Sequence, residues 1–366
     1  MSDTNRAWLI LANASVRASE FRSLLDRFGD IGGIIAAGGS RLAEAGLPAA
    51  KCTMIASPDN SHIDREFDWL CDRDHHLVPL DSDAFPELFL QLADPPLVLY
   101  VNGDRDALHL PALAIVGSRN PTAGGRRNAV EFARHLGQLG FVIVSGLAEG
   151  IDAAAHRGAL DGGAKTVAFL GHGIDRVYPA ANRDLAHEIA STGALVSEYP
   201  FGTEPKRYHF PERNRLISGL SLGTLVVEAA RRSGSLITAR LAAEQGREVF
   251  ALPGSIHNPL ARGCHELIRQ GAKLVETADD IVAELAPLVG HVLQNAEESI
   301  ANDEPECVGD SEYVQLQKYL SHDPVGVDVL AQRSGLTIDK VSSMLLILEL
   351  EGRIEAVSGG RYSLLS

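Results

Sequence analysis

The sequence has few cysteines and no long apolar run. Its four cysteines in 366 residues, Cys52, Cys71, Cys264 and Cys307, form no CxxC pair, and this spacing excludes a disulfide framework or a zinc knuckle. No apolar run reaches the about 20 residues that a membrane span needs, and the N-terminus lacks the residue order of a signal peptide. We therefore expect a reduced, cytoplasmic protein that is neither exported nor inserted in a membrane.

The sequence also lacks the motifs of several enzyme classes. It has no Walker lysine loop, no GxSxG elbow, no cysteine with an obvious base and no clustered carboxylates for magnesium. The GxGxxG turn of a dinucleotide site is missing as well. These absences favour binding over hydrolysis, so we predict a protein that is not an enzyme and has no cofactor and no metal.

Acidic residues outnumber basic ones, but unevenly along the chain. The formal net charge is −15, which ordinarily opposes binding to a polyanion. Residues 112–280, however, hold 19 Lys and Arg against 17 Asp and Glu, whereas residues 1–111 hold 9 against 17. A near-neutral centre rich in arginine between acidic flanks permits a local anion site.

Residues 1–78 predict a small helical domain. Apolar residues recur at three-to-four spacing over 8–14, 18–28 and 32–37, and glycines separate these stretches. The segment FGDIGGIIAAG also fits a helix-hairpin-helix that presents backbone N–H groups to a phosphate, but its acidic surroundings favour a plain helical bundle. The chain then continues into loops and one apolar strand, LVLYV.

From residue 111 onwards, short apolar strands alternate with amphipathic helices. This alternation predicts an α/β fold with a Rossmann-like, doubly wound parallel sheet that binds ligands at the carboxyl ends of its strands. We assign residues 79–286 to this domain, including a lead-in segment. The expected strands are 113–118, 141–146, 166–171, 194–199, 223–229, 248–254 and 273–277, and the expected helices are 125–139, 151–161, 182–191, 236–245 and 264–270.

The remaining residues predict an acidic linker over 287–310 and a winged helix over 311–366. Three helices are expected at 314–320, 327–333 and 338–350, followed by two short strands about Gly359 and Gly360. The third helix carries Lys340 as its only basic residue. This favours a protein contact or a structural role over DNA reading.

Two strand ends supply candidate anion-binding groups. The first strand ends in Gly117, Ser118 and Arg119 before a helix, and backbone N–H groups at a helix N-terminus attract anions. The second ends in Ser145 and Gly146. The alternative is that these glycines only turn the chain.

Further along the second strand's helix, Asp152 and His156 share one face. They fit an acid–base dyad or half of a metal site, but a helix-stabilising hydrogen bond is favoured.

Basic and aromatic residues interleave most densely between residues 203 and 235. In such a mixture the basic side chains contact the phosphate backbone of a nucleic acid, and the aromatic rings stack on its bases. Alternatively, Arg213 and Arg215 pair with Glu212 or Glu228, Phe210 belongs to the core, and Ser233 caps a helix. The candidates in this region are Lys206, Arg207, Phe210, Arg213, Ser233 and Ser235.

At these residues the sequence resembles the DNA-processing protein A (DprA, also called Smf) family. The resemblance rests on an ordered set of motifs over about 170 residues. They are AIVGSRNPTAGG, VSGLAEGIDAAAHRGAL, TVAFLGHGID with VYP, LVSEYPFGTEP, YHFPERNRLISGLS, EAARRSGSLITARLA and FALPGS with GCHELIRQGA. The flanks resemble the sterile-alpha-motif domain and the winged helix of longer members.

The resemblance implies a function in natural transformation (competence) and DNA recombination. It implies a non-enzymatic cytoplasmic protein that dimerises through its Rossmann domain, binds single-stranded DNA without sequence preference and helps load the RecA recombinase. Carried over by motif, Arg119 and Arg207 hold phosphates. Where many relatives have a lysine this chain has Ala180, and Arg183 or Lys206 is expected to compensate.

Two other functions stay open at this point. The segment GLSLGTLVVEA resembles the GGxGTxxE loop of Rossmann-like phosphoribohydrolases, with Glu228 as an acid and Arg213 as a phosphate clamp, although the leading Pro-Gly-Gly is absent. A transcription regulator with a duplex-reading winged helix is the other alternative, and it requires a basic recognition helix that the sequence does not show.

Overall fold

The computed structural model describes residues 3–288, 316, 318–320, 325–350, 354–357 and 361–364. The chain begins with a bundle of six short helices whose core includes Trp8 and Phe21, with ring centroids 4.7 Å apart. Local sequence sets where these helices begin and end: the Arg17 N–H donates to the Glu20 carboxylate at the start of α2, and Gly29 at φ +86° follows its last turn. The helices are α1 (Asp3–Asn13), α2 (Ala18–Phe28), α3 (Ile31–Ala36), α4 (Gly38–Glu44), α5 (Ala49–Ala56) and α6 (Asn60–Trp69).

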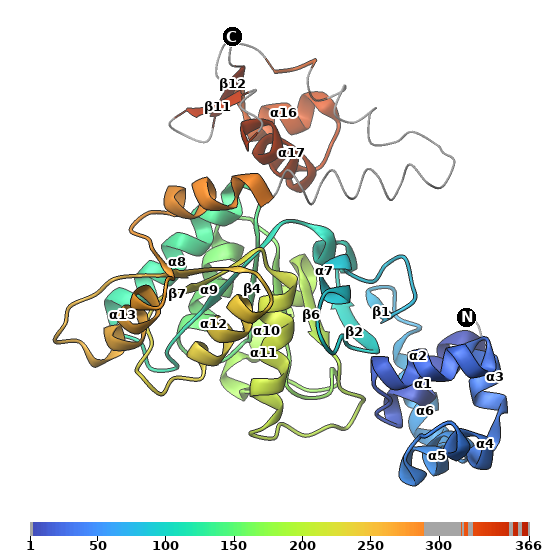
Figure 1. Cartoon of the computed structure of the whole chain (residues 1–366). Coiled ribbons are helices and arrows are strands. Elements are labelled where there is room, and N and C mark those ends of the chain that lie inside the picture. Colours follow the sequence, from blue (N-terminus) through green and yellow to red (C-terminus); the bar gives the residue numbers. More distant parts are fainter. Residues whose placement is uncertain are drawn as a thin grey trace.

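A nine-stranded sheet forms the centre of the molecule, in the order β1-β2-β6-β5-β4-β3-β7-β8-β9 (Figure 1). Strands β3 to β9 run parallel to one another, whereas β2 pairs antiparallel with both β1 and β6. The prediction of a doubly wound, Rossmann-like α/β sheet is confirmed. The strands are β1 (His75–Pro79), β2 (Val98–Gly103), β3 (Ala112–Val116), β4 (Val142–Ser145), β5 (Thr166–Phe169), β6 (Ala194–Ser197), β7 (Gly223–Val226), β8 (Glu248–Ala251) and β9 (Lys273–Leu274).

The two antiparallel edge strands connect the sheet to the helical bundle, which lies beside β1 and β2 in Figure 1. The expected domain boundary between residues 78 and 79 falls within β1, because this strand already pairs with β2 from His75 onwards. The lead-in also contains α7 (Glu87–Leu90) and the 3₁₀ helix η1 (Arg105–His109), two elements that the sequence did not indicate.

Helices cover both faces of the sheet, and alternate residues of β3 show which helices lie on each face. Leu113 and Ile115 pack with residues of α8 and α9, while Ala114 and Val116 belong to the cluster that contains Leu216 of α11. The helix α10 lies beside α9 and contacts β2, β5 and β6. The elements are α8 (Ala123–Gln138), α9 (Ile151–Asp161), η2 (Ala180–Asn182), α10 (Arg183–Thr192), α11 (His209–Leu220), α12 (Ser235–Glu244), η3 (Pro259–Ala261) and α13 (Arg262–Arg269).

The strand order creates a switch point at the centre of the sheet. The chain passes from β3 through β4 and β5 to β6, then returns along α11 to place β7 on the other side of β3. In open α/β sheets, ligands bind outside the carboxyl ends of the strands near such a point.

The described part of the C-terminal region has the elements of a winged helix. A three-stranded sheet in the order β10-β12-β11 accompanies two helices. The linker residues 289–310, residues 314, 315 and 317 of the expected helix at 314–320 and the Gly359–Gly360 turn lie outside the described residues. The elements are β10 (Val325–Gly326), α16 (Val327–Ser334), α17 (Ile338–Leu350), β11 (Ile354–Val357) and β12 (Arg361–Leu364).

Candidate nucleic-acid interface

An arginine and two aromatic rings lie together at the carboxyl ends of the strands. Arg119, in the loop after β3, places its guanidinium carbon 5.7 Å from the centroid of the Phe210 ring. The Tyr178 ring, from the loop after β5, lies 5.8 Å from the same Phe210 ring. Arg119 is exposed, Tyr178 is 48% exposed and Phe210 is half-buried. We call these three residues the strip.

Three further residues with polar or charged groups precede Phe210 in the sequence. Lys206, Arg207 and Tyr208 are all exposed, and we call them the basic loop. The Lys206 Nζ lies 5.9 Å from the Tyr208 ring centroid, and Tyr208 is 57% exposed. Cation–π contacts at exposed sites are weak, so these rings and cations remain available to a ligand that stacks on aromatic faces and carries negative charge.

The N-terminus of α8 is closed to a phosphate by the protein's own carboxylate. Glu228 accepts hydrogen bonds from the Thr122 N–H (2.8 Å), the Thr122 hydroxyl (2.7 Å) and the Asn258 amide (3.3 Å). A Cβ atom at Gly125 would lie only 2.6 Å from Glu228 Oε2, so glycine is required there. This corrects the expectation of an anion site at this helix N-terminus, because a carboxylate already satisfies its positive dipole.

Internal hydrogen bonds hold the strand-end loop after β3. The Ser118 N–H donates to the Glu228 carbonyl (2.7 Å) and the Ser118 carbonyl accepts from the Ile151 N–H (3.1 Å). The Ser118 hydroxyl accepts from the Asn120 N–H (3.1 Å). These bonds fix the backbone from Gly117 onwards and hold Arg119 at the surface.

Arg213 lies beneath this surface. It is 3% exposed, and its guanidinium donates to the Phe169 carbonyl at the end of β5. Burial lowers the pKa of Arg213 to about 10, against the opposing effect of the Asp152 negative charge. The expectation that Arg213 contacts DNA is therefore corrected, and the same burial removes the open phosphate clamp required by the phosphoribohydrolase alternative.

The residues expected at the end of β4 are also used internally. The Ser145 hydroxyl is buried and donates to the Ile115 carbonyl (2.6 Å), and the Gly146 N–H donates to Asp152 Oδ2 (3.2 Å). Neither offers a free donor to a ligand. Likewise Arg215 pairs with Glu198 rather than with Glu212 or Glu228.

His156 does not form a dyad with Asp152. The Thr166 hydroxyl donates to the Ile143 carbonyl (2.6 Å), so its oxygen accepts from His156 Nδ1–H (2.7 Å). Burial, together with the positive charge of Arg213, lowers the pKa of His156 to about 3. A buried, neutral histidine is a structural group here.

The other candidates stand at or near the starts of two helices. Arg183 is exposed at the first position of α10, and Ala180 is exposed in η2. Ser233 and Ser235, whose hydroxyls are 2.7 Å apart, stand at the start of α12. Ser233 borders a cavity of ≈ 430 Å³ between α12 and α13, and Ser235 is buried.

Sequence reasoning missed Tyr178 as a site residue. It stands in the VYP motif, but a single tyrosine before a proline gives no pattern of its own. The signal that identifies it is topological, because the loops after β3 and β5 open at the same edge of the sheet.

The third helix of the winged helix, α17, packs on the Rossmann domain. Val341 and Leu345 belong to the core of the winged helix, whereas Leu346 and Ile347 join a cluster with Leu285. A cavity of ≈ 840 Å³ adjoins this contact, lined in part by the residues that precede β4 and β5. The winged helix thus lies at the edge of the sheet where β4 and β5 begin, opposite their carboxyl ends, and Figure 1 shows α17 on the side of the winged helix that faces the rest of the chain.

Comparisons with known proteins agree with this architecture. The DNA recombination-mediator protein A family matches residues 76–286, and the DprA winged helix domain matches residues 301–360. The chain is 42% identical over 320 residues to Protein Smf of Escherichia coli (strain K12), covering 87% of this chain and 85% of that protein. It is 43% identical over 226 residues to DNA processing protein DprA of Streptococcus pneumoniae (strain ATCC BAA-255 / R6), covering 62% of this chain and 78% of that protein.

Two solved structures are similar as well. The X-ray structure of DprA from Streptococcus pneumoniae has a TM-score of 0.68 at 37% identity and covers 78% of this chain and 99% of that chain. The second is DNA processing protein A from Helicobacter pylori, with a TM-score of 0.53 at 33% identity, which covers 57% of this chain and 95% of that chain. That structure is described for its single-stranded DNA binding mode.

A Rossmann-like sheet with an exposed basic and aromatic strip, followed by a winged helix, defines the class of protein. The family matches and the relatives then identify it further: the chain belongs to the DprA/Smf family of DNA-processing proteins. Among the described residues, no helix combines the length and the apolar character that crossing a bilayer requires.

Proposed function

We propose that this protein binds single-stranded DNA without sequence preference along the strip and the basic loop. The observation that carries the proposal is that Arg119 and Tyr178 both contact the ring of Phe210, at 5.7 Å and 5.8 Å from its centroid, where Arg119 and Tyr178 are exposed. Every base has a face that stacks on an aromatic ring, and a cation beside the ring neutralises phosphate. Neither contact reads sequence.

The proposed contacts are fewer than the residues expected from the sequence. Arg119, Lys206 and Arg207 hold phosphates, while Tyr178 and Phe210 stack bases. Gly117, Ser118, Arg183 and Ser233 stay predicted contacts. The proposal leaves out Ser145, Gly146, Arg213 and Ser235, because these residues are buried or use their donors in internal hydrogen bonds.

We test this with fluorescence anisotropy of a labelled oligo-dT and of a duplex of equal length over a salt series. The parent is expected to prefer the single strand, with affinity that falls as salt rises. Arg119→Ala and Arg207→Ala each remove about one phosphate contact, so each weakens binding and lowers the salt slope by about 0.7. Arg134→Ala removes an equally exposed arginine from α8 and serves as the matched control. Equal binding by all four proteins contradicts the proposal.

The biological role follows from family membership and is proposed with it. We propose a non-enzymatic protein that helps load RecA onto single-stranded DNA during natural transformation and that acts as a homodimer through its Rossmann domain. RecA assembly on immobilised oligo-dT is expected to accelerate with the parent and not with Arg119→Ala. Sedimentation equilibrium is expected to give the mass of a dimer.

We also propose the domain division into residues 1–78, 79–286, 287–310 and 311–366, with β1 counted in the Rossmann-like sheet from His75 onwards. The acidic composition of 287–310 resists packing into a core. Limited proteolysis followed by mass spectrometry is expected to cut there first, and an initial cut inside the Rossmann domain contradicts the division.

A further inference from the structure

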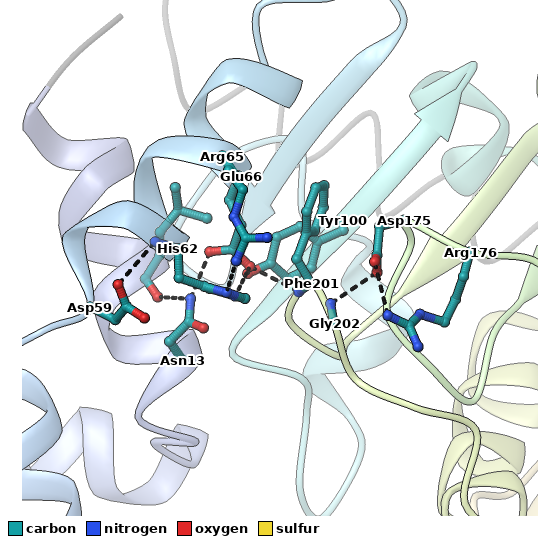
Figure 2. Close-up of polar contacts among 11 residues, drawn as sticks. Asn13, Asp59, His62, Arg65, Glu66, Tyr100, Asp175, Arg176, Phe201 and Gly202 are labelled. Carbon is teal, nitrogen blue, oxygen red and sulfur yellow. Dashed lines mark hydrogen bonds and ion pairs between the residues drawn. The ribbon is translucent and has the colours of Figure 1, made fainter.

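A buried carboxylate joins the helical bundle to the loop that leads into the basic loop. Glu66 of α6 is 0% exposed, and Figure 2 shows it surrounded by groups from three parts of the chain. Its Oε1 accepts from the Phe201 N–H (3.0 Å) and the Tyr100 hydroxyl (3.1 Å), and its Oε2 accepts from the Asn13 amide (2.6 Å). A buried carboxylate requires such donors, because an unpaired buried charge is strongly destabilising.

A second carboxylate holds the next amide of the same loop. The Gly202 N–H donates to Asp175 Oδ1 (3.1 Å), and one residue further on the Thr203 carbonyl accepts from the Gly173 N–H (3.0 Å). Asp175 and Gly173 belong to the loop after β5, which carries Tyr178 of the strip. Two adjacent amides are therefore fixed by carboxylates from two different domains, as Figure 2 shows.

The side chain of Phe201 reinforces this attachment. Its ring lies edge-on to Trp69 at a centroid distance of 5.5 Å and 6.1 Å from the ring of Tyr100. Trp69 is the last residue of α6, so the bundle contacts this loop through both the backbone and the side chain of one residue.

The loop from 198 to 208 contains no helix or strand, so its anchors determine its position. Only two residues separate Thr203 from Lys206, and Phe210 of the strip follows at the start of α11. Without an anchor, ordering the backbone of each loop residue on binding costs conformational entropy.

We propose that Glu66 is a positioning residue through which the helical bundle holds the basic loop in the conformation that binds single-stranded DNA. This rests on the proposed function of the strip. The bundle thereby contributes to DNA affinity through the position of the basic loop.

The test compares Glu66→Met with Glu66→Gln in the full chain. Methionine has a similar length but no acceptor for the Phe201 N–H, whereas glutamine keeps Oε1 as an acceptor. Glu66→Met is expected to weaken oligo-dT binding about tenfold, the lower end of the effect of losing a charge-assisted hydrogen bond. Glu66→Gln is expected to restore most of the affinity. Hydrogen exchange of residues 199–208, followed by mass spectrometry, is expected to accelerate in Glu66→Met alone.

Asn13→Ala is the control for a purely structural effect. It removes a hydrogen bond to the same carboxylate from the bundle side and leaves the Phe201 bond in place. If Asn13→Ala and Glu66→Met lower the melting temperature and the DNA affinity equally, Glu66 only stabilises the bundle and the positioning role is wrong.

The outcomes also separate this inference from the proposed function. If the parent binds oligo-dT and Glu66→Met binds equally well, the positioning role fails while the proposed function stands. If the parent does not bind oligo-dT but Glu66→Met still accelerates exchange in residues 199–208, the proposed function fails and the anchoring role of Glu66 is supported.

Discussion

The Arg119 guanidinium lies over the ring of Phe210, 5.7 Å from its centroid, although the two residues belong to different strand connections of the sheet. Arg119 follows β3, and Phe210 lies in the first turn of α11, which carries the chain back across the sheet to β7. The contact therefore exists only because the switch point of the doubly wound sheet brings these connections together. Stacking and charge neutralisation are thereby combined at one position.

This relationship predicts coupling between the two side chains in DNA binding. Phe210→Ala is expected to weaken oligo-dT binding about tenfold, within the range of about 1–3 kcal/mol for loss of a stacked base. Arg119→Ala is expected to weaken it by a similar factor. The double variant is expected to lose less than the product of both factors, since each residue positions the other. A double-mutant cycle by anisotropy measures this, and factors that simply multiply contradict the coupling.

Much of the fold was predictable because its signal is local. The seven parallel strands are short, nearly continuous apolar runs, and their helices have clear amphipathic spacing. The helix α11 was not predicted: its sequence from His209 to Leu220 was interpreted through its basic and aromatic residues, although Leu216, Ile217 and Leu220 belong to the apolar core.

The site was predictable only in part, because sequence spacing does not show which side of an element faces the solvent. Arg119 and Phe210 were expected and lie in the strip, whereas Arg213 on the same helix as Phe210 points into the protein. Tyr178 reaches the strip through the order of the strands, which no local pattern reveals. The Glu228 carboxylate at the start of α8 depends on the same long-range arrangement.

A glycine between β4 and α9 is predicted to be essential for the loop that carries Arg119. Gly150 has φ +89°, and a Cβ atom there would lie 2.5 Å from the Arg119 carbonyl oxygen. Gly150→Ala therefore adds a steric overlap to an unfavourable backbone conformation, and it is expected to lower the free energy of unfolding by about 3 kcal/mol. Urea denaturation measures the loss.

Gly163→Ala is the matched control for this prediction. Gly163 also has a positive φ, +75°, but no atom lies within 4 Å of the added Cβ. Gly163→Ala is therefore expected to lower the free energy of unfolding by about 1–2 kcal/mol, the cost of the backbone conformation alone. Equal losses for both variants contradict the overlap at Gly150.

The contact of α17 with the Rossmann domain is predicted to depend on Ile347. This residue is 9% exposed and packs in the cluster that contains Leu285. Ile347→Lys is expected to detach the winged helix from the Rossmann domain, because the lysine charge would be buried without a partner. The radius of gyration measured by small-angle X-ray scattering is then expected to rise. Val329→Lys changes a residue of α16 that is 39% exposed. This control is expected to leave the radius of gyration unchanged.

The buried His156 of α9 makes the stability of the Rossmann domain depend on pH. Burial and the Arg213 charge lower the pKa of His156 to about 3 from an ordinary value of 6.5. Because the unfolded chain takes up a proton near pH 6.5 and the folded chain does not, the unfolded state binds more protons between these two pH values. The contribution of His156 to stability is therefore fully present above pH 6.5 and is lost as the pH falls towards 3.

Replacing His156 is therefore predicted to flatten the pH dependence of stability. For the parent, lowering the pH from about 7.5 to about 5 removes roughly 2 kcal/mol of unfolding free energy through this group. His156→Gln lowers stability at neutral pH, because the bond to Thr166 is disturbed, but loses about 2 kcal/mol less than the parent on acidification. Urea denaturation at both pH values measures the difference, with His187→Gln on the exposed side of α10 as the control. A parent and a His156 variant with equal acid sensitivity would show that His156 becomes protonated in the folded protein.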